Sequence, residues 1–153
     1  MEALHIDHLN KSYGDKHVLK DMTLSVQPGE IYGFVGSNGA GKSTTMRIAL
    51  GVLSSDSGEV RIGTTPMNDD LRRLIGYMPE ERGLYAKEKL ADQLTFFGKL
   101  HGLDKARAKK NAEGLLERLG LAERMNDKLD ELSLGNQQRV QLAASLVHDP
   151  ALL

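Results

Sequence analysis

Cysteine is missing from all 153 positions of this sequence. Its absence excludes a disulfide framework and any metal site made of thiolates, and it fits a cytosolic protein. An excess of one charge is missing as well, because 20 basic residues stand against 21 acidic ones. A net charge of -1 gives no reason to expect a nucleic acid or an anionic lipid as a partner.

Long apolar runs are also absent. No segment reaches the ~18 continuous apolar residues that a membrane-spanning helix needs. The N-terminal stretch "MEALHIDHL" does not combine a basic region with an apolar run, as a secretion signal does. We therefore expect one domain of ordinary size, with neither a membrane span nor a secretion signal.

The first half of the chain is predicted to be mainly extended. Residues 22–26 alternate apolar with polar side chains, which is typical of a half-buried strand, and Pro28–Gly29 turn the chain afterwards. The apolar run "EIYGFV" at 30–35 then predicts a central strand that is buried on both faces. A helix is expected over 43–53, followed by short strands at 59–62 and 75–78.

The second half is predicted to be helical. Apolar residues share one face of a helix that Gly102 ends, and of a second helix that Asp104 opens and Gly120 closes. Ser133 is a good N-cap for a final helix, which "HDP" at 148–150 stops. The residues expected on the buried faces are Leu90, Leu94, Phe97, Ala112, Leu115, Leu116, Leu119, Val140, Ala143, Ala144 and Val147.

The stretch "GSNGAGKS" at 36–43 matches the pattern G-x-x-x-x-G-K-[ST]. It lies between the expected strand at 30–35 and the expected helix at 43–53, which is the setting that its chemistry requires. The glycines let the backbone amides surround a phosphate chain, and the helix N-terminus adds partial positive charge. Lys42 can then reach the β- and γ-phosphates, while the Ser43 hydroxyl can ligate Mg²⁺.

Further motifs indicate to which class of phosphate-binding protein the chain is similar. Together with Tyr13 and the phosphate loop, "IGYMPEERGLY" at 75–85 and "LSLGNQQRVQLAASLVHDP" at 132–150 follow one another in a familiar order and spacing. On these motifs the whole chain resembles the nucleotide-binding domain of an ABC transporter, and most closely that of bacterial export ATPases with an LSxGNQQ signature. The resemblance implies an α/β fold, namely a P-loop NTPase core with an N-terminal antiparallel β subdomain and an α-helical subdomain.

The resemblance also divides the chain and implies roles for its residues. It places the β subdomain and P-loop core at 1–87, the helical subdomain at 88–134, and the signature helix with the start of the next core strand at 135–153. Tyr13 matches the aromatic ring that stacks on adenine. The phosphate cradle matches Gly36, Asn38, Gly39, Gly41, Lys42, Ser43 and Thr44. The signature, which in the family closes over the γ-phosphate held by a second, head-to-tail subunit, matches Ser133, Gly135, Asn136 and Gln137.

Two residues depart from the usual family pattern. Leu134 replaces a glycine of the signature, so its side chain must point away from the phosphate. Glu80 replaces the glutamine of the Q-loop, which contacts Mg²⁺ and the attacking water, and a carboxylate can still ligate that ion. Its neighbours Glu81 and Arg82 are interpreted as an ordinary charged loop. His148 is expected to interact with carbonyl groups at a helix end.

The resemblance implies an ATPase that binds ATP and Mg²⁺ and works with a second nucleotide-binding domain and a membrane permease. Such a subunit is cytoplasmic and peripheral on the inner face of the cell membrane, and no nucleic acid is expected. The strand with the family's Mg²⁺-binding aspartate and water-polarising glutamate would follow Leu153, so the 153 residues are expected to bind MgATP without hydrolysing it. Two alternatives stay open: a soluble ABC-type ATPase acting on ribosomes or DNA, and a non-catalytic nucleotide-binding module.

Overall fold

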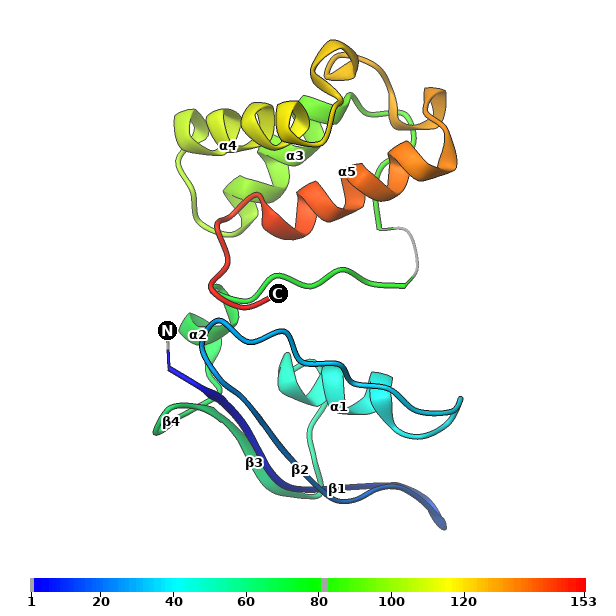
Figure 1. Cartoon of the computed structure of the whole chain (residues 1–153), viewed down its shortest axis with the longest axis vertical. Helices are drawn as coiled ribbons and strands as arrows, with labels where there is room; N and C mark the ends of the chain where they lie inside the picture. The colour runs from blue at the N-terminus through cyan, green and yellow to red at the C-terminus, as the bar shows by residue number, and fades with distance from the viewer. Residues whose placement is uncertain (1, 81–82) are drawn as a thin grey trace. The chain divides into compact units, whose positions relative to one another are not determined.

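The computed structural model describes residues 2–80 and 83–153. The chain forms two compact units, of which the first ends at Arg72 and the second runs from Arg73 to Leu153. The first unit holds the β-sheet and two helices, and the second holds the remaining helices (Figure 1). The finer division of the chain predicted from the sequence stays a prediction.

The first unit is built on an antiparallel sheet of four strands in the order β2-β1-β3-β4. The strands are β1 (Leu4–Tyr13), β2 (Lys16–Val26), β3 (Ser57–Ile62) and β4 (Thr65–Pro66). β1 lies in the middle, and its Leu4 pairs with Val26 of β2 on one side and Ile62 of β3 on the other. The antiparallel β subdomain is confirmed, and the predicted strands at 22–26 and 59–62 lie within β2 and β3.

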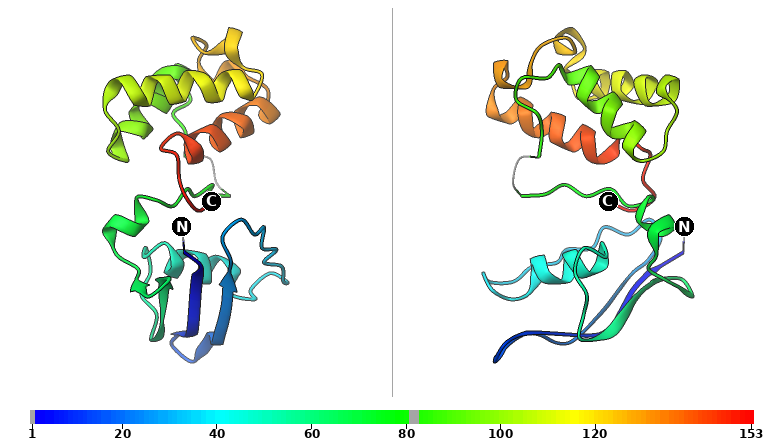
Figure 2. Two further views of the ribbon diagram at one scale, coloured as in Figure 1. Left: turned by 60° about the vertical axis from the view of Figure 1, so that its left-hand side comes forward. Right: turned by 180° about the vertical axis from the view of Figure 1, so that it is seen from behind.

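Helix α1 (Lys42–Ala49) covers one face of this sheet (Figure 2). It starts one residue before the predicted position and ends early, because Gly51 has a φ of 68° that continues no right-handed helix. A short helix, α2 (Asp69–Arg72), closes the unit. The core between sheet and helix consists of Ile6, Leu9, Leu19, Ile48 and Val60.

The predicted buried strand at 30–35 is wrong for this structure. Ile31 is 99% exposed and Val35 is 88% exposed, and the segment has no strand conformation. An apolar run predicts burial, but a strand also needs neighbouring strands that accept its hydrogen bonds. Among the described residues, none pairs with 30–35 in a sheet.

The predicted strand at 75–78 is reduced to one bridge. Ile75 pairs in parallel with Leu152, and the Gly76 amide donates to the Leu152 carbonyl at 2.7 Å. The Ala151 amide donates to the Leu74 carbonyl, also at 2.7 Å. The residues after Pro150 therefore run beside the start of the segment that leads to Glu80.

The second unit packs three long helices against one another: α3 (Leu90–Leu100), α4 (Lys105–Arg118) and α5 (Leu134–Leu146) (Figure 2). Two 3-10 turns, η1 (Ala122–Arg124) and η2 (Leu129–Glu131), connect α4 to α5. The predicted apolar faces meet in its core, where the fully buried members include Leu90, Leu94, Ala112, Leu116, Val140, Ala143 and Val147.

The predicted helix ends of this unit are confirmed. The Asp104 side chain caps α4 by accepting from the Arg107 amide at 3.0 Å, and the helix is followed by Gly120 at a φ of 72°. Gly102 after α3 has a φ of 95°. Within the described part of the chain, none of the helices is long and apolar enough to span a bilayer.

Candidate nucleotide-binding site

The loop at 36–43 runs directly into the first turn of α1. Gly39 and Gly41 have φ values of 84° and 85°, in the left-handed region that glycine enters without steric strain. The first helical hydrogen bond runs from the Thr45 amide to the Gly41 carbonyl at 2.8 Å. The amides of residues 42–44 therefore precede the helical ladder and point out of the helix start, where a helix favours an anion.

Gly41 holds this loop tightly against strand β2. A Cβ atom at this position would lie 2.5 Å from Leu19 Cδ2 and 3.0 Å from the Val18 carbonyl oxygen. Leu19 is buried in the core, so its side chain cannot swing away freely. The backbone of the loop thus approaches the sheet at a distance that only glycine permits.

The Lys42 side chain folds back over its own loop. Its ammonium donates to the Gly36 carbonyl and, at 2.8 Å, to the Ser37 carbonyl. This places one positive charge above the loop, beside the free end of α1. The Ser43 side chain, one residue further along α1, is exposed. The start of α1 therefore carries a lysine whose ammonium lies against the loop carbonyls and, next to it, an exposed hydroxyl.

Tyr13 belongs to the same unit as this loop. It is the last residue of β1 and pairs with Lys16 at the turn into β2, the strand whose Leu19 lies against Gly41. The residue is 51% exposed, and the Lys11 ammonium lies over its ring at 5.6 Å from the ring centroid. The sheet therefore connects the aromatic ring to the phosphate loop through one strand.

The signature residues form the start of α5 in the second unit. Ser133 caps the helix, with its Oγ accepting from the Asn136 amide at 3.4 Å. The Gln137 side chain donates to the Leu132 carbonyl at 3.0 Å. A Cβ atom on Gly135 would meet no neighbouring atom within 4 Å, and Leu134 is 62% exposed. The helix start is open to a partner molecule.

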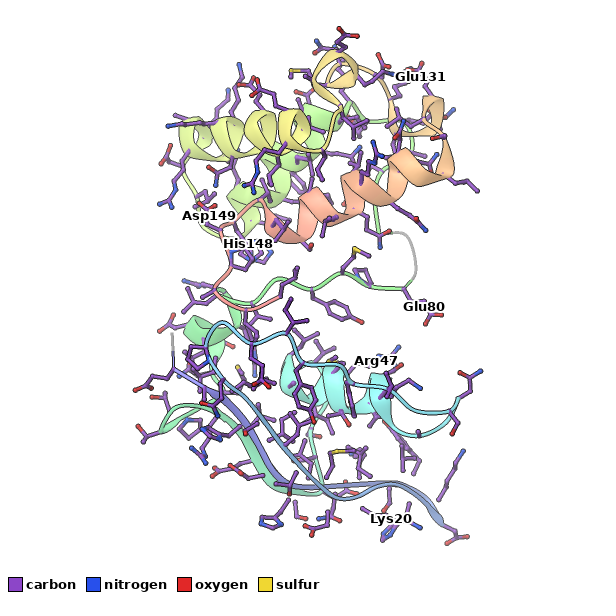
Figure 3. The ribbon with its side chains drawn as sticks, viewed as in Figure 1. Lys20, Arg47, Glu80, Glu131, His148 and Asp149 are labelled. Carbon is purple, nitrogen blue, oxygen red and sulfur yellow. The ribbon has the colours of Figure 1, made fainter. Side chains whose placement is uncertain are left out.

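Glu80 lies at the end of the segment that begins at Arg73, and its side chain is exposed (Figure 3). Glu81 and Arg82 lie outside the described residues. The residue before Glu80 is attached to the signature helix, because the buried Gln141 side chain donates to the Pro79 carbonyl at 2.7 Å. Ser43 and Glu80 belong to different units, so their joint role as Mg²⁺ ligands stays a prediction.

Comparison with known proteins decides the family. The family model described as ABC transporter matches residues 19–153. This chain belongs to the ABC transporter family. It is 41% identical to the uncharacterized ABC transporter ATP-binding protein YhaQ of Bacillus subtilis, over 98% of this chain and 50% of that protein. It is 37% identical to the linearmycin resistance ATP-binding protein LnrL of the same organism, over 98% of this chain and 49% of that protein.

A solved structure agrees with the family and with the fold. The cbiO1 protein of Clostridium perfringens, part of the ABC transporter complex cbiONQ, matches with a TM-score of 0.84 and 27% identity. The match covers 96% of this chain and 62% of that one. The α/β P-loop NTPase fold is therefore confirmed. This ABC chain spans about half the length of the curated relatives it matches.

Two residues that support the ABC site were not predicted from the sequence. Thr45 is buried, and its hydroxyl donates to the Gly41 carbonyl at 2.9 Å, which fixes the end of the loop. The repeated hydroxyl in "STT" was a signal for it, since a threonine in the first turn can bond to a carbonyl four residues earlier. Gln141 left no comparable signal, because its partner is a backbone carbonyl of Pro79, far away in sequence.

Proposed function

We propose that this chain is the ATP-binding part of a subunit that couples ATP hydrolysis to export by a bacterial ABC transporter. The observation that carries the proposal is the loop at 36–43. Gly41 is pressed against β2, the amides at the start of α1 point outward, and Lys42 places its charge over the same spot. This arrangement suits a chain of phosphates.

The proposed ligand is MgATP. The amides of the loop and of the α1 start would surround the phosphates, with Gly36, Asn38, Gly39, Gly41 and Thr44 shaping the cradle and Lys42 neutralising the distal charge. Bound Mg²⁺ supplies charge neutralisation to the phosphoryl group. The exposed hydroxyl of Ser43 and the exposed carboxylate of Glu80 offer the oxygen ligands that this ion prefers.

The proposed base site is the ring of Tyr13. Half of the Tyr13 residue is exposed to solvent, and aromatic faces accept any nucleobase by stacking. The strand β2 connects this ring to the phosphate loop, so one rigid element would set the distance between base and phosphate positions.

A second nucleotide-binding domain is the proposed partner at the signature. The α5 start offers the Ser133 hydroxyl, the adjacent backbone amides and the amide side chain of Asn136, while the Gln137 side chain donates to the Leu132 carbonyl beside them. These are the donors that a terminal phosphate requires, and Leu134 is exposed beside them. In a head-to-tail pair, each signature would meet the nucleotide on the other subunit.

The proposed membrane partner is a permease subunit, which would place this chain on the cytoplasmic face of the membrane. The second unit has an open, mainly apolar pocket of about 260 Å³ beside the Glu80 segment. It is lined in part by Tyr77 of that segment, by Leu84, by Phe97 of α3 and by Ala144 of α5. Such a pocket suits an apolar element of a partner protein. The absence of hydrolysis expected of the 153 residues stays a prediction, which a phosphate-release assay tests.

Calorimetric titration with MgATP and with MgADP tests the nucleotide site. Lys42→Ala removes one charged donor to the distal phosphates, so ATP affinity should fall by about 10- to 100-fold, the equivalent of ~1.5–3 kcal/mol for a charged hydrogen bond. ADP should bind weakly in both proteins. Lys20→Ala, at an exposed lysine on β2, serves as the matched control and should leave both affinities unchanged. Equal ATP affinity of the parent and Lys42→Ala would refute the assignment.

A further inference from the structure

An ion pair joins the end of β1 to the turn that precedes β3. The Lys11 ammonium and an Asp56 carboxylate oxygen lie 3.0 Å apart, and only 13% of the Lys11 side chain is exposed. The second carboxylate oxygen accepts from the Ser12 amide at 2.7 Å, and the Asp56 amide donates to the Asn10 carbonyl at 2.9 Å. Three consecutive residues of β1 are thus bonded to this one aspartate.

The contacts of Asp56 stabilise the charged form of its carboxyl group. The hydrogen bond from Lys11 lowers the pKa of the Asp56 carboxyl, and the bond from the Ser12 amide adds to that effect. Asp56 therefore stays ionised at neutral pH. Both of its oxygens are engaged, so the position of the Lys11 ammonium is defined by a fixed acceptor.

The same ammonium lies over the ring of Tyr13. Lys11 and Tyr13 are two residues apart on one strand, which puts their side chains on the same face of the sheet. The ammonium is 5.6 Å from the ring centroid, within the range of a cation–π contact. The ammonium therefore lies over one face of the Tyr13 ring, and the Tyr13 residue as a whole is 51% exposed.

We infer that Lys11 and Asp56 are positioning residues for the nucleobase: Asp56 holds the Lys11 ammonium, and this ammonium holds the Tyr13 ring so that its opposite face receives the base. The inference rests on the proposed role of Tyr13. Neither Lys11 nor Asp56 would touch the nucleotide. The Asp56 side chain is 47% exposed, and an ion pair that is open to solvent on one side adds little to stability, so we place its value in the orientation of the ring.

Comparison of ATP with inorganic triphosphate isolates the contribution of the base. Calorimetry gives the ratio of the two dissociation constants for the parent, for Lys11→Met and for Asp56→Asn. We expect both substitutions to lower the preference for ATP by at least about threefold, a part of the total that base stacking supplies. The affinity for triphosphate should not change, because the phosphate loop is untouched.

Conservative and combined variants test the mechanism. Lys11→Arg should keep the preference for ATP, since a guanidinium pairs with carboxylates and lies flat on aromatic rings. Lys11→Met combined with Asp56→Asn should be no worse than Lys11→Met alone, because both changes break one chain of contacts. Asp7→Asn is the matched control, because it removes a different ion pair of β1, the one that Asp7 makes at 2.8 Å with Arg61 of β3.

The outcomes separate this inference from the proposed function. If Tyr13→Ala lowers the preference for ATP while Lys11→Met and Asp56→Asn leave it intact, the positioning role is refuted and the base site stands. If Tyr13→Ala has no effect either, the ring does not bind the base and both ideas fail. An equal loss of the preference for ATP in Asp7→Asn would show a general effect of ion-pair removal on the sheet, and it would also overturn the inference. Thermal unfolding of each variant verifies that the protein is folded.

Discussion

Replacing Gly41 by alanine tests whether the phosphate loop is pinned against the sheet. Gly41 has a φ of 85°, and its Cβ would lie 2.5 Å from Leu19 Cδ2 and 3.0 Å from the Val18 carbonyl oxygen. Gly39 is a natural control, because its φ is 84° but no atom lies within 4 Å of the corresponding Cβ. The two alanine variants thus share the backbone strain and differ in the steric overlap.

The expected loss of stability has two parts. A non-glycine residue in the left-handed region costs about 1–2 kcal/mol, which both variants should lose. Gly41→Ala should lose about 1–3 kcal/mol more, the usual cost of forcing a methyl group into a packed core. Leu19 cannot relieve the overlap freely because it is only 1% exposed.

Urea unfolding followed by circular dichroism measures both losses. The midpoint should fall in both variants with an unchanged slope, and it should fall further for Gly41→Ala. Combining Gly41→Ala with Leu19→Ala removes the closest overlapping atom, so the double variant should lose less than the sum of the single losses. Equal midpoints for Gly41→Ala and Gly39→Ala would refute the close approach of the loop to β2.

Two further predictions concern the second unit. Glu80→Gln should weaken Mg²⁺ binding to the nucleotide complex about tenfold, with little change in metal-free nucleotide binding. Glu117→Gln is the control variant. If metal titrations of the parent and of Glu80→Gln are indistinguishable, Glu80 does not belong to the site. His148 should make stability fall in acid: burial lowers its pKa below 6.5, although the Ile75 carbonyl and the Asp149 charge oppose this shift. Well above pH 6.5, His148 is neutral in both the folded and the unfolded chain. Below pH 6.5, the unfolded chain takes up a proton on His148 before the folded chain does, which favours unfolding. Urea midpoints at pH ~8 and ~5.5 should therefore differ more in the parent than in His148→Gln, and equal differences would contradict the argument.

Local signals in the sequence predicted the helices and the phosphate loop well. Asp104 and Ser133 are caps because their short side chains reach amides three residues further on, and this needs no information from elsewhere in the chain. The positive φ of Gly39 and Gly41 follows in the same way from the loop pattern. Periodicity likewise identified the buried faces of α3 and α5.

Pairing between distant segments was not predictable in this way. The run at 30–35 has the composition of a buried strand, yet among the described residues nothing pairs with it in a sheet, and Ile31 is exposed. Composition reports how favourable burial would be, while strand formation depends on which neighbours are there to accept the hydrogen bonds. The ion pair of Lys11 with Asp56 joins residues 45 positions apart, and neither residue is unusual in its local pattern.

The segment that leads to Glu80 shows why such contacts matter for coupling. Its start is held where His148 Nε2 lies 3.1 Å from the Ile75 carbonyl, and its end is held where the Gln141 side chain donates to the Pro79 carbonyl. Both side chains come from α5 or from the residues just after it, and the Ile75 carbonyl can only accept, so the buried imidazole must donate through Nε2. Every residue has a backbone carbonyl, so no sequence pattern marks those of Ile75 and Pro79 as hydrogen-bond partners. Because both ends of the segment are bonded to the signature helix and its extension, a displacement of α5 must move residues 75–79 or break these bonds.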